Sequence, residues 1–187
     1  MTEEIRDRFN EIKQQFMLMK NGVVSDSMKA AGSPHRIIWG LNMPQLREIA
    51  QRFDLSRDLF DALWHDTSTR ESVIIAPMLL PYDELSVDDA IALIDEAPTL
   101  EAIDSLTFNA LRHRRDVWDI IAALDGSDAI NRRYAAMRLL ARVIRENLQG
   151  AKALAEREAG RKDARTYTAA DNILGDIEFL SSGDASL

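Results

Sequence analysis

Apolar residues recur at spacings of three and four along almost the whole chain, which is the pattern of amphipathic α-helices. Residues 2–19 show it clearly, because Thr2 is placed to cap the first turn and the apolar residues that follow are Ile5, Phe9, Ile12, Phe16 and Met19. No segment shows the strict alternation between turn residues that is typical of a β-strand. The pattern therefore predicts an all-α fold.

Capping residues and helix breakers divide the chain into about ten helices. Ser56, Ser86 and Thr99 are each placed to cap a helix N-terminus. Ser68 is followed three residues later by Glu71, which is the spacing of a capping box. The expected helices cover residues 2–19, 25–31, 45–53, 59–64, 73–80, 87–94, 100–111, 117–124, 128–148, 151–162 and 169–180.

The length of 187 residues suits one domain with a core of its own. Helices of this size joined by short loops stack as antiparallel pairs in an α-α superhelix. We therefore expect a single helical repeat domain over residues 1–180 and a disordered tail over residues 181–187.

Composition excludes several kinds of chemistry. The chain has no cysteine, so it has neither disulfides nor a cysteine nucleophile, and its histidines, His35, His65 and His113, lack the i, i+4 spacing of helical metal ligands. We expect no metal and no other cofactor. The charged N-terminus does not resemble a signal peptide, and no apolar run approaches the ~20 residues that span a bilayer. We expect no membrane partner and a cytoplasmic protein.

The net charge of -8 argues against a protein that binds polyanions through overall charge. The sum hides an uneven distribution, because residues 112–145 contain 8 arginines and only 4 acidic residues, whereas both flanking segments are acidic. Arg138, Arg142 and Arg145 fall at i, i+4 and i+7 and form one helical stripe. An apolar stripe lies beside it and consists of Tyr134, Met137, Ala141 and Ile144.

Three interpretations of the arginine stripe are open. It can bind successive phosphates of a nucleic acid, an acidic protein partner, or carboxylates of neighbouring helices.

Asp104 lies between Ile103 and Leu106 at the border of a buried face, where a partly desolvated carboxylate can stabilise a cation. The ordinary alternative is an exposed border carboxylate or an internal cap. Trp39, beside Gly40 in a loop, either fills the core or faces a ligand.

Four stretches resemble the AlkD-like DNA alkylation repair family and follow one another in that family's order. Residues 38–50, IWGLNMPQLREIA, resemble its N-terminal signature, and residues 62–71 resemble its Leu-Trp and Arg-Glu element. Ile-Asp-Ser at residues 103–105 and NRRYAAM at residues 131–137 are similar to two later elements. The resemblance covers about residues 5–150.

The resemblance implies a right-handed solenoid of antiparallel HEAT-like helix pairs, with a basic concave face around duplex DNA. Active members of the family hydrolyse the N-glycosidic bond of N3- and N7-alkylated purines. Asp104 matches the catalytic aspartate, which would stabilise the positive charge that develops as the base leaves. The residues expected to contact DNA are Arg133, Arg138, Arg142, Arg145 and Trp39.

The chain also departs from the family pattern. Leu100 stands where active members have a tryptophan four residues before the aspartate, and the arginine expected before Ala-Ala falls on Tyr134, or on Arg133 after a shift of one residue. From this resemblance we expect the later repeats, which carry a further tryptophan in the family, to be shortened or missing. The sequence therefore leaves two functions open. One is an alkylpurine-DNA glycosylase or damaged-DNA binder with an incomplete catalytic constellation, and the other is a non-catalytic HEAT-like scaffold that binds a protein or nucleic acid.

Overall fold

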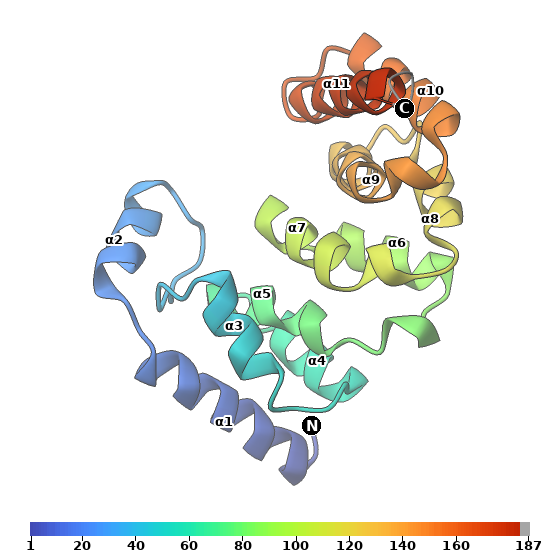
Figure 1. Ribbon diagram of the computed structural model, residues 1–187. Coiled ribbons are helices and arrows are strands. Elements are labelled where there is room, and N and C mark those ends of the chain that lie inside the picture. Colours follow the sequence, from blue (N-terminus) through green and yellow to red (C-terminus); the bar gives the residue numbers. More distant parts are fainter. Residues whose placement is uncertain (184–187) are drawn as a thin grey trace. The chain divides into compact units, whose positions relative to one another are not determined.

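The computed structural model describes residues 1–183 and confirms the all-α prediction (Figure 1). Within these residues there is no β-strand, and Ile37 and Thr69 form one isolated parallel bridge. The chain divides into two compact units, residues 1–84 and residues 85–187. The single domain expected over residues 1–180 stays a prediction.

The first unit is built around the packing of its first helix against its fourth. Ile5, Ile12 and Phe16 are the buried side chains of α1, and the rings of Phe60 and Trp64 on α4 stack with centroids 5.5 Å apart. The elements of this unit are α1 (Glu3–Leu18), α2 (Gly22–Ala30), α3 (Met43–Ala50), α4 (Arg57–Trp64), α5 (Arg70–Ile75), and the 3-10 turns η1 (Ala76–Leu79) and η2 (Tyr82–Glu84).

The loop before α3 is held by one buried carboxylate. Glu71, at the start of α5, accepts hydrogen bonds from the backbone N–H groups of Trp39 at 3.0 Å and Gly40 at 2.9 Å. Gly40 has a φ of +78°, and a Cβ there would lie 2.3 Å from the carbonyl oxygen of Asn21. Arg70 pairs with Glu71 at 3.2 Å and balances its charge. The resemblance at residues 38–50 and 62–71 therefore includes both partners of one structural contact.

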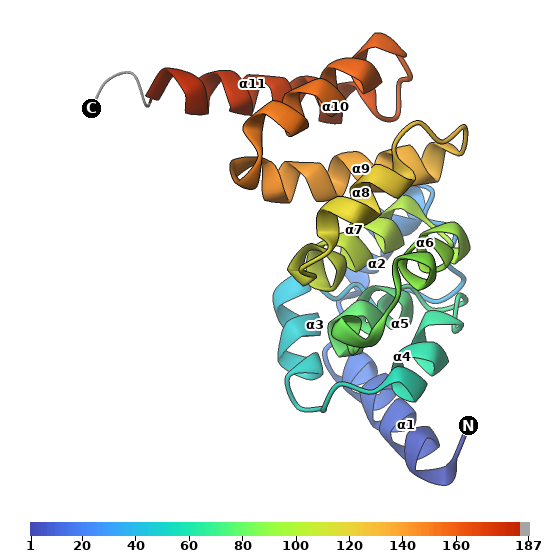
Figure 2. The same ribbon diagram turned by 90° about the vertical axis from the view of Figure 1, so that its right-hand side faces the viewer.

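The second unit is arranged around α9. This helix packs against α6, α7, α8 and α11, and α10 and α11 lie side by side as a pair (Figure 2). Five side chains near its middle are buried, namely Ala135, Ala136, Met137, Leu139 and Leu140. The elements are α6 (Val87–Glu96), α7 (Leu100–Asn109), η3 (Leu111–His113), α8 (Val117–Leu124), α9 (Ile130–Val143), η4 (Ile144–Glu146), α10 (Leu148–Gly160) and α11 (Tyr167–Gly183).

Four of the predicted caps are confirmed, and the predicted capping box is wrong. The side chains of Thr2, Ser56, Ser86 and Thr99 accept hydrogen bonds at the starts of α1, α4, α6 and α7. The capping box at residues 68–71 does not form, because the Glu71 carboxylate reaches the distant loop instead. Asn21 caps α2, which starts at Gly22, three residues earlier than the expected start at residue 25.

Several helix boundaries in the second unit also differ, and α10 starts at Leu148 rather than at residue 151. The helix expected over residues 128–148 runs as α9 only to Val143, and a 3-10 turn follows it. The last helix continues to Gly183, through the first part of the segment expected to be a disordered tail, residues 181–187. Residues 184–187 lie outside the described residues.

Candidate functional site

Asp104 lies on α7 at the border of the core, as predicted. Thr99 caps this helix by accepting a hydrogen bond from the backbone N–H of Ala102 at 3.1 Å. Ile103 and Leu106 are fully buried, whereas the Asp104 side chain is 37% exposed. The carboxylate is therefore partly desolvated and still accessible from solvent.

Tyr134 on α9 holds the Asp104 carboxylate. Its hydroxyl donates to the two carboxylate oxygens, which lie 3.0 and 3.1 Å away. Burial, followed by the charge and the hydrogen bond of Asp104, raises the pKa of Tyr134 to about 12. The phenol therefore stays protonated near neutral pH and remains a hydrogen-bond donor. The sequence placed Tyr134 on an apolar stripe, which is correct for its half-buried ring and wrong for its hydroxyl.

Arg138, one helical turn after Tyr134, forms an ion pair with the same carboxylate. Its Nε lies 2.5 Å from Oδ1 of Asp104, and its guanidinium carbon lies 6.0 Å from the centroid of the Tyr134 ring. The Arg138 side chain is 34% exposed. Asp104 is thus held by one neutral donor and one cation.

A second contact between α7 and α9 lies one turn further along both helices. The guanidinium carbon of Arg142 lies 4.9 Å from the ring centroid of Phe108, and that of Arg112 lies 3.8 Å from the same centroid. Both distances are in the range of cation–π contacts. Nε of Arg112 donates to Nε2 of His113 at 3.2 Å, and burial together with the charge of Arg112 lowers the pKa of His113 below its ordinary value.

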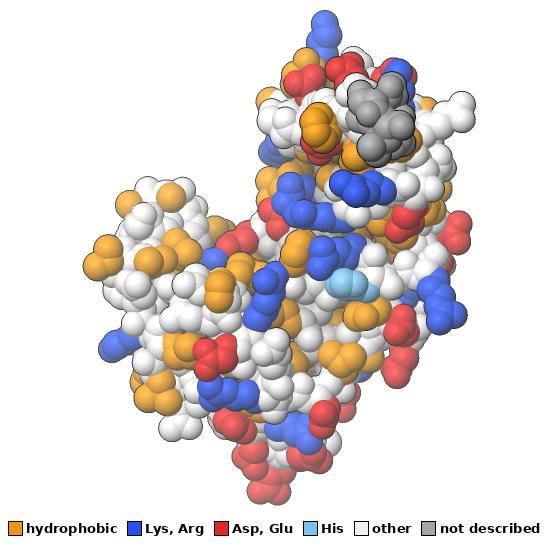
Figure 3. All heavy atoms as spheres, viewed as in Figure 1, with side chains coloured by type: hydrophobic (Ala, Val, Ile, Leu, Met, Phe, Trp, Pro, Cys, Tyr) orange, Lys and Arg blue, Asp and Glu red, His pale blue; other side chains and the backbone are white. Residues whose placement is uncertain are grey.

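Arg142 and Arg145 extend this cationic surface. Both are exposed, and among the described residues neither has a carboxylate partner. They also line a surface pocket between the end of α9 and α11, whose other lining residues are Ala141, Ile144, Asp176, Phe179 and Leu180. We call Arg112, Arg138, Arg142 and Arg145 the basic face, and Figure 3 shows Lys and Arg side chains gathered over α9 on this side.

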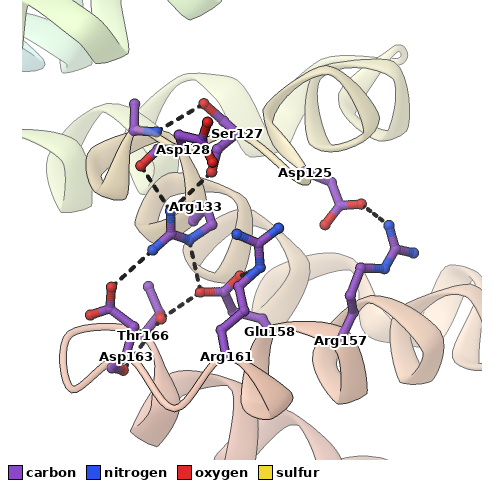
Figure 4. Close-up of polar contacts among 10 residues, drawn as sticks. Asp125, Ser127, Asp128, Arg133, Arg157, Glu158, Arg161, Asp163 and Thr166 are labelled. Atoms are coloured by element: carbon purple, nitrogen blue, oxygen red, sulfur yellow. Dashed lines mark hydrogen bonds and ion pairs between the residues drawn. The ribbon is translucent and has the colours of Figure 1, made fainter.

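Arg133 points into the protein and is not part of the basic face (Figure 4). Its Nε donates to Glu158 at 3.1 Å and its Nη2 donates to Asp163 at 2.9 Å. Its Nη1 donates to the backbone oxygens of Ser127 and Asp128 at 2.9 and 3.0 Å. These contacts occupy every nitrogen of the side chain, which is buried, so the structure gives the predicted DNA contact of Arg133 no support.

Within the arginine stripe, the ion-pair interpretation fits Arg138, which pairs with Asp104, and, among the described residues, not Arg142 or Arg145. Other arginines of residues 112–145 also form ion pairs. Arg132 pairs with Asp95 on α6 at 2.5 Å, and hydrogen bonding from this arginine holds the pKa of Asp95 below its ordinary value. Arg114 forms two hydrogen bonds with Asp116, at 2.8 and 2.6 Å. The arginine-rich segment therefore serves the fold as well as the surface.

Trp39 belongs to the first unit, and its ring is half-buried. Its indole Nε1 is buried and has no hydrogen-bond partner among the described residues. Its backbone is fixed by Glu71, as described above. The loop geometry thus favours a packing role, and DNA contact by Trp39 stays a prediction.

Sequence analysis did not anticipate the roles of Tyr134, Phe108 and Arg112. The signal was a shared spacing, because Asp104 and Phe108 lie four residues apart on α7, as do Tyr134, Arg138 and Arg142 on α9. Side chains that lie four residues apart on one helix can contact side chains with the same spacing on a neighbouring helix. The sequence alone does not show that α7 and α9 are such neighbours. In the part of the chain that the structure describes, no group of three His, Asp or Glu side chains is placed to hold a metal ion.

The fold and this site define an all-helical protein with a cationic surface around one accessible carboxylate. The family model for DNA alkylation repair enzymes matches residues 12–180. This match covers most of the chain, so the chain belongs to that family, and DNA interaction is the property that the family suggests. No curated protein matches the chain, and no solved structure matches it. None of the described helices has the length and apolar character needed to cross a bilayer.

Proposed function

We propose that this protein binds alkylated duplex DNA through its basic face and releases the alkylated purine, with Asp104 as the catalytic residue. Family membership supports a role in DNA repair. The observation that carries the finer proposal is the placement of a partly exposed, tyrosine-held carboxylate beside Arg138 and the Arg142–Phe108–Arg112 stack. A right-handed solenoid of antiparallel HEAT-like helix pairs remains part of this proposal, supported by the paired helices α10 and α11.

The chemistry suits a carboxylate without a metal. As an N-alkylated purine leaves, the deoxyribose gains oxocarbenium character, and a nearby anion stabilises that charge and can orient the attacking water. The hydroxyl of Tyr134, whose single proton is shared between the two carboxylate oxygens, fixes where that anion lies. The guanidinium groups of the basic face would hold the phosphates on either side, since arginine binds phosphate through a planar fork.

Base release from a duplex containing 7-methylguanine tests the proposal. We expect Asp104→Asn to slow release by roughly 100-fold, the effect of removing one electrostatic group from an active site. Asp95→Asn is the matched control, because Asp95 pairs with Arg132 at the same 2.5 Å and with similar exposure, 40% against 37%. It should release base at the wild-type rate. Equal rates for Asp104→Asn and the wild type would contradict a catalytic role.

The alternative is a scaffold that binds DNA or a protein without chemistry. Two observations favour it, namely Leu100 in place of an aromatic residue one turn before Asp104, and the ion pair that Arg138 makes with that carboxylate. A scaffold would release no base and would bind methylated and unmodified duplex equally. In that case Arg138→Glu combined with Arg142→Glu should abolish duplex binding, whereas a protein partner would be indicated if binding to duplex were absent from the start.

A further inference from the structure

We propose that Arg138 is an exchangeable partner of Asp104: it moves from the carboxylate to a DNA phosphate when duplex binds, while Tyr134 keeps the carboxylate in place. This inference rests on the proposed function, because it assumes that the basic face binds DNA. It assigns Arg138 and Tyr134 as positioning residues with different tasks. In the free protein, the positive charge of Arg138 pairs with the Asp104 carboxylate. After Arg138 has moved to a phosphate, Tyr134 keeps that carboxylate in position.

The contact of Arg138 with Asp104 is the kind that can be exchanged. Both side chains are about one-third exposed, at 34% and 37%, so water can replace either partner. Exposed ion pairs contribute little net stability. The guanidinium lies on the same helical stripe as Arg142, which has no carboxylate partner among the described residues. A phosphate bound at Arg142 would therefore lie within reach of the Arg138 side chain.

Tyr134 is the opposite kind of partner. Its ring is half-buried, its side chain has few rotatable bonds, and its hydroxyl lies 3.0 and 3.1 Å from the two carboxylate oxygens. The Tyr134 hydroxyl contacts the carboxylate directly and not through Arg138. Departure of the arginine would leave the carboxylate in the same place with one fewer positive neighbour.

The exchange would couple DNA binding to the availability of negative charge. A carboxylate that is paired with a cation stabilises a second cation poorly, because the two positive charges compete for it. When a phosphate takes Arg138, the negative charge of Asp104 becomes available to a cationic base or sugar. The carboxylate would thus be unmasked only where a polyanion is already bound.

A double-mutant cycle in duplex affinity tests the exchange. In the wild-type background, Asp104→Asn should tighten binding of an unmodified duplex by about two- to fivefold, because Arg138 no longer has to leave a carboxylate. In the Arg138→Gln background, the same change should lose most of this gain. Arg138→Gln alone should reduce the slope of log affinity against log salt by about one phosphate contact.

Asp95 and Arg132 supply the matched cycle. This pair has the same 2.5 Å contact and exposures of 40% and 35%, but Arg132 lies about 120° around α9 from Arg138. We expect the Asp95→Asn and Arg132→Gln cycle to be additive, with an unchanged salt slope. An additive cycle at Asp104 and Arg138 would overturn the exchange while leaving DNA binding intact. Absence of duplex binding by the wild-type protein would instead overturn the proposed function itself.

Single-turnover base release separates the two positioning residues. With protein in excess and DNA at saturation, Tyr134→Phe should release base more slowly than the wild type. Arg138→Gln should act through weaker duplex binding and raise the protein concentration that half-maximal release requires. A slow Arg138→Gln variant that is fully bound would show that the arginine acts in the chemical step and would contradict the exchange.

Discussion

Asp95 and Asp104 each form an ion pair at 2.5 Å with an arginine of α9. Asp104 also accepts a hydrogen bond from the hydroxyl of Tyr134, so two different side chains hold this carboxylate. An aspartate that only forms an exposed ion pair can follow its partner. An aspartate held by a half-buried phenol cannot follow its partner in this way. Such a fixed position is what a carboxylate needs if it must lie beside a reacting atom.

The phenol of Tyr134 predicts a specific loss of stability at high pH. The pKa of Tyr134 rises to about 12 in the folded protein, against 10.0 for an unperturbed tyrosine. The folded state therefore favours the protonated form, so this contribution is fully present below about pH 10 and is lost between about pH 10 and about pH 12.

Urea unfolding at about pH 9 and about pH 11 measures that contribution. Tyr134→Phe should remove this part of the pH dependence. Tyr167→Phe is the control, because Tyr167 is 43% exposed and makes no hydrogen bond to a carboxylate among the described residues. Identical pH profiles for the wild type and Tyr134→Phe would show that Asp104 and burial do not hold the phenol in its protonated form.

At the level of the elements, the loop between α2 and α3 depends on a residue without a side chain. Gly40 combines a left-handed φ with contact against the backbone of Asn21. Gly40→Ala should lower the free energy of unfolding by about 2 to 4 kcal/mol through backbone strain and overpacking. Gly32→Ala, at a φ of +85° with no atom within 4 Å, should cost only the strain, about 1 to 2 kcal/mol.

Chemical denaturation of both variants separates the two contributions. Equal losses would mean that the loop moves away from Asn21 without cost, and that the close approach at Gly40 has no energetic role.

A structural feature could be predicted from the sequence when the residues that form it lie close together in the chain. Features formed by distant residues could not be predicted. Caps such as Ser86 were predicted correctly because their partners lie three residues away. Glu71 was misassigned for the opposite reason, since its backbone partners lie about 30 residues earlier in the chain.

The site followed the same rule. Asp104 and the arginine stripe were visible as local patterns, and the burial of Asp104 at the border of the core was predicted. The hydroxyl of Tyr134 and the carboxylate of Glu158 were not anticipated as partners, because they meet Asp104 and Arg133 only after distant helices pack.

At the scale of the whole molecule, a buried ionic cluster ties the last helices to α9. Glu158 on α10 is 2% exposed. Its carboxylate accepts hydrogen bonds from Arg133 on α9 and from the hydroxyl of Thr166 at 2.6 Å, and it forms an ion pair with Arg161 at 3.5 Å. Removal of one partner from a buried ion pair leaves an uncompensated charge. We expect Glu158→Gln to lower the free energy of unfolding by on the order of 3 kcal/mol.

The neighbouring residue provides the control. Arg157 forms an ion pair with Asp125, and its side chain is 54% exposed, so Arg157→Ala should cost less than about 1 kcal/mol. Thermal and denaturant unfolding of the two variants give the comparison. A Glu158→Gln variant as stable as Arg157→Ala would mean that Asp163 alone compensates the buried guanidinium.

The total charge of -8 also has a different meaning once the structure is known. Several acidic side chains are paired with arginines of the same chain, at the surface for Asp95 and Asp116 and in the core for Glu158. The sum therefore does not describe what a ligand meets at the basic face.

Three consecutive residues of α9 point to three different helices. Arg132 pairs with Asp95 on α6, Arg133 with Glu158 on α10, and Tyr134 with Asp104 on α7. Each step along an α-helix turns the side chain by about 100°. Insertion or deletion of a single residue near the start of α9 would therefore turn each of these side chains away from its partner helix. Length variation among relatives should accordingly spare this turn and accumulate in the loops, however freely the individual amino acids change.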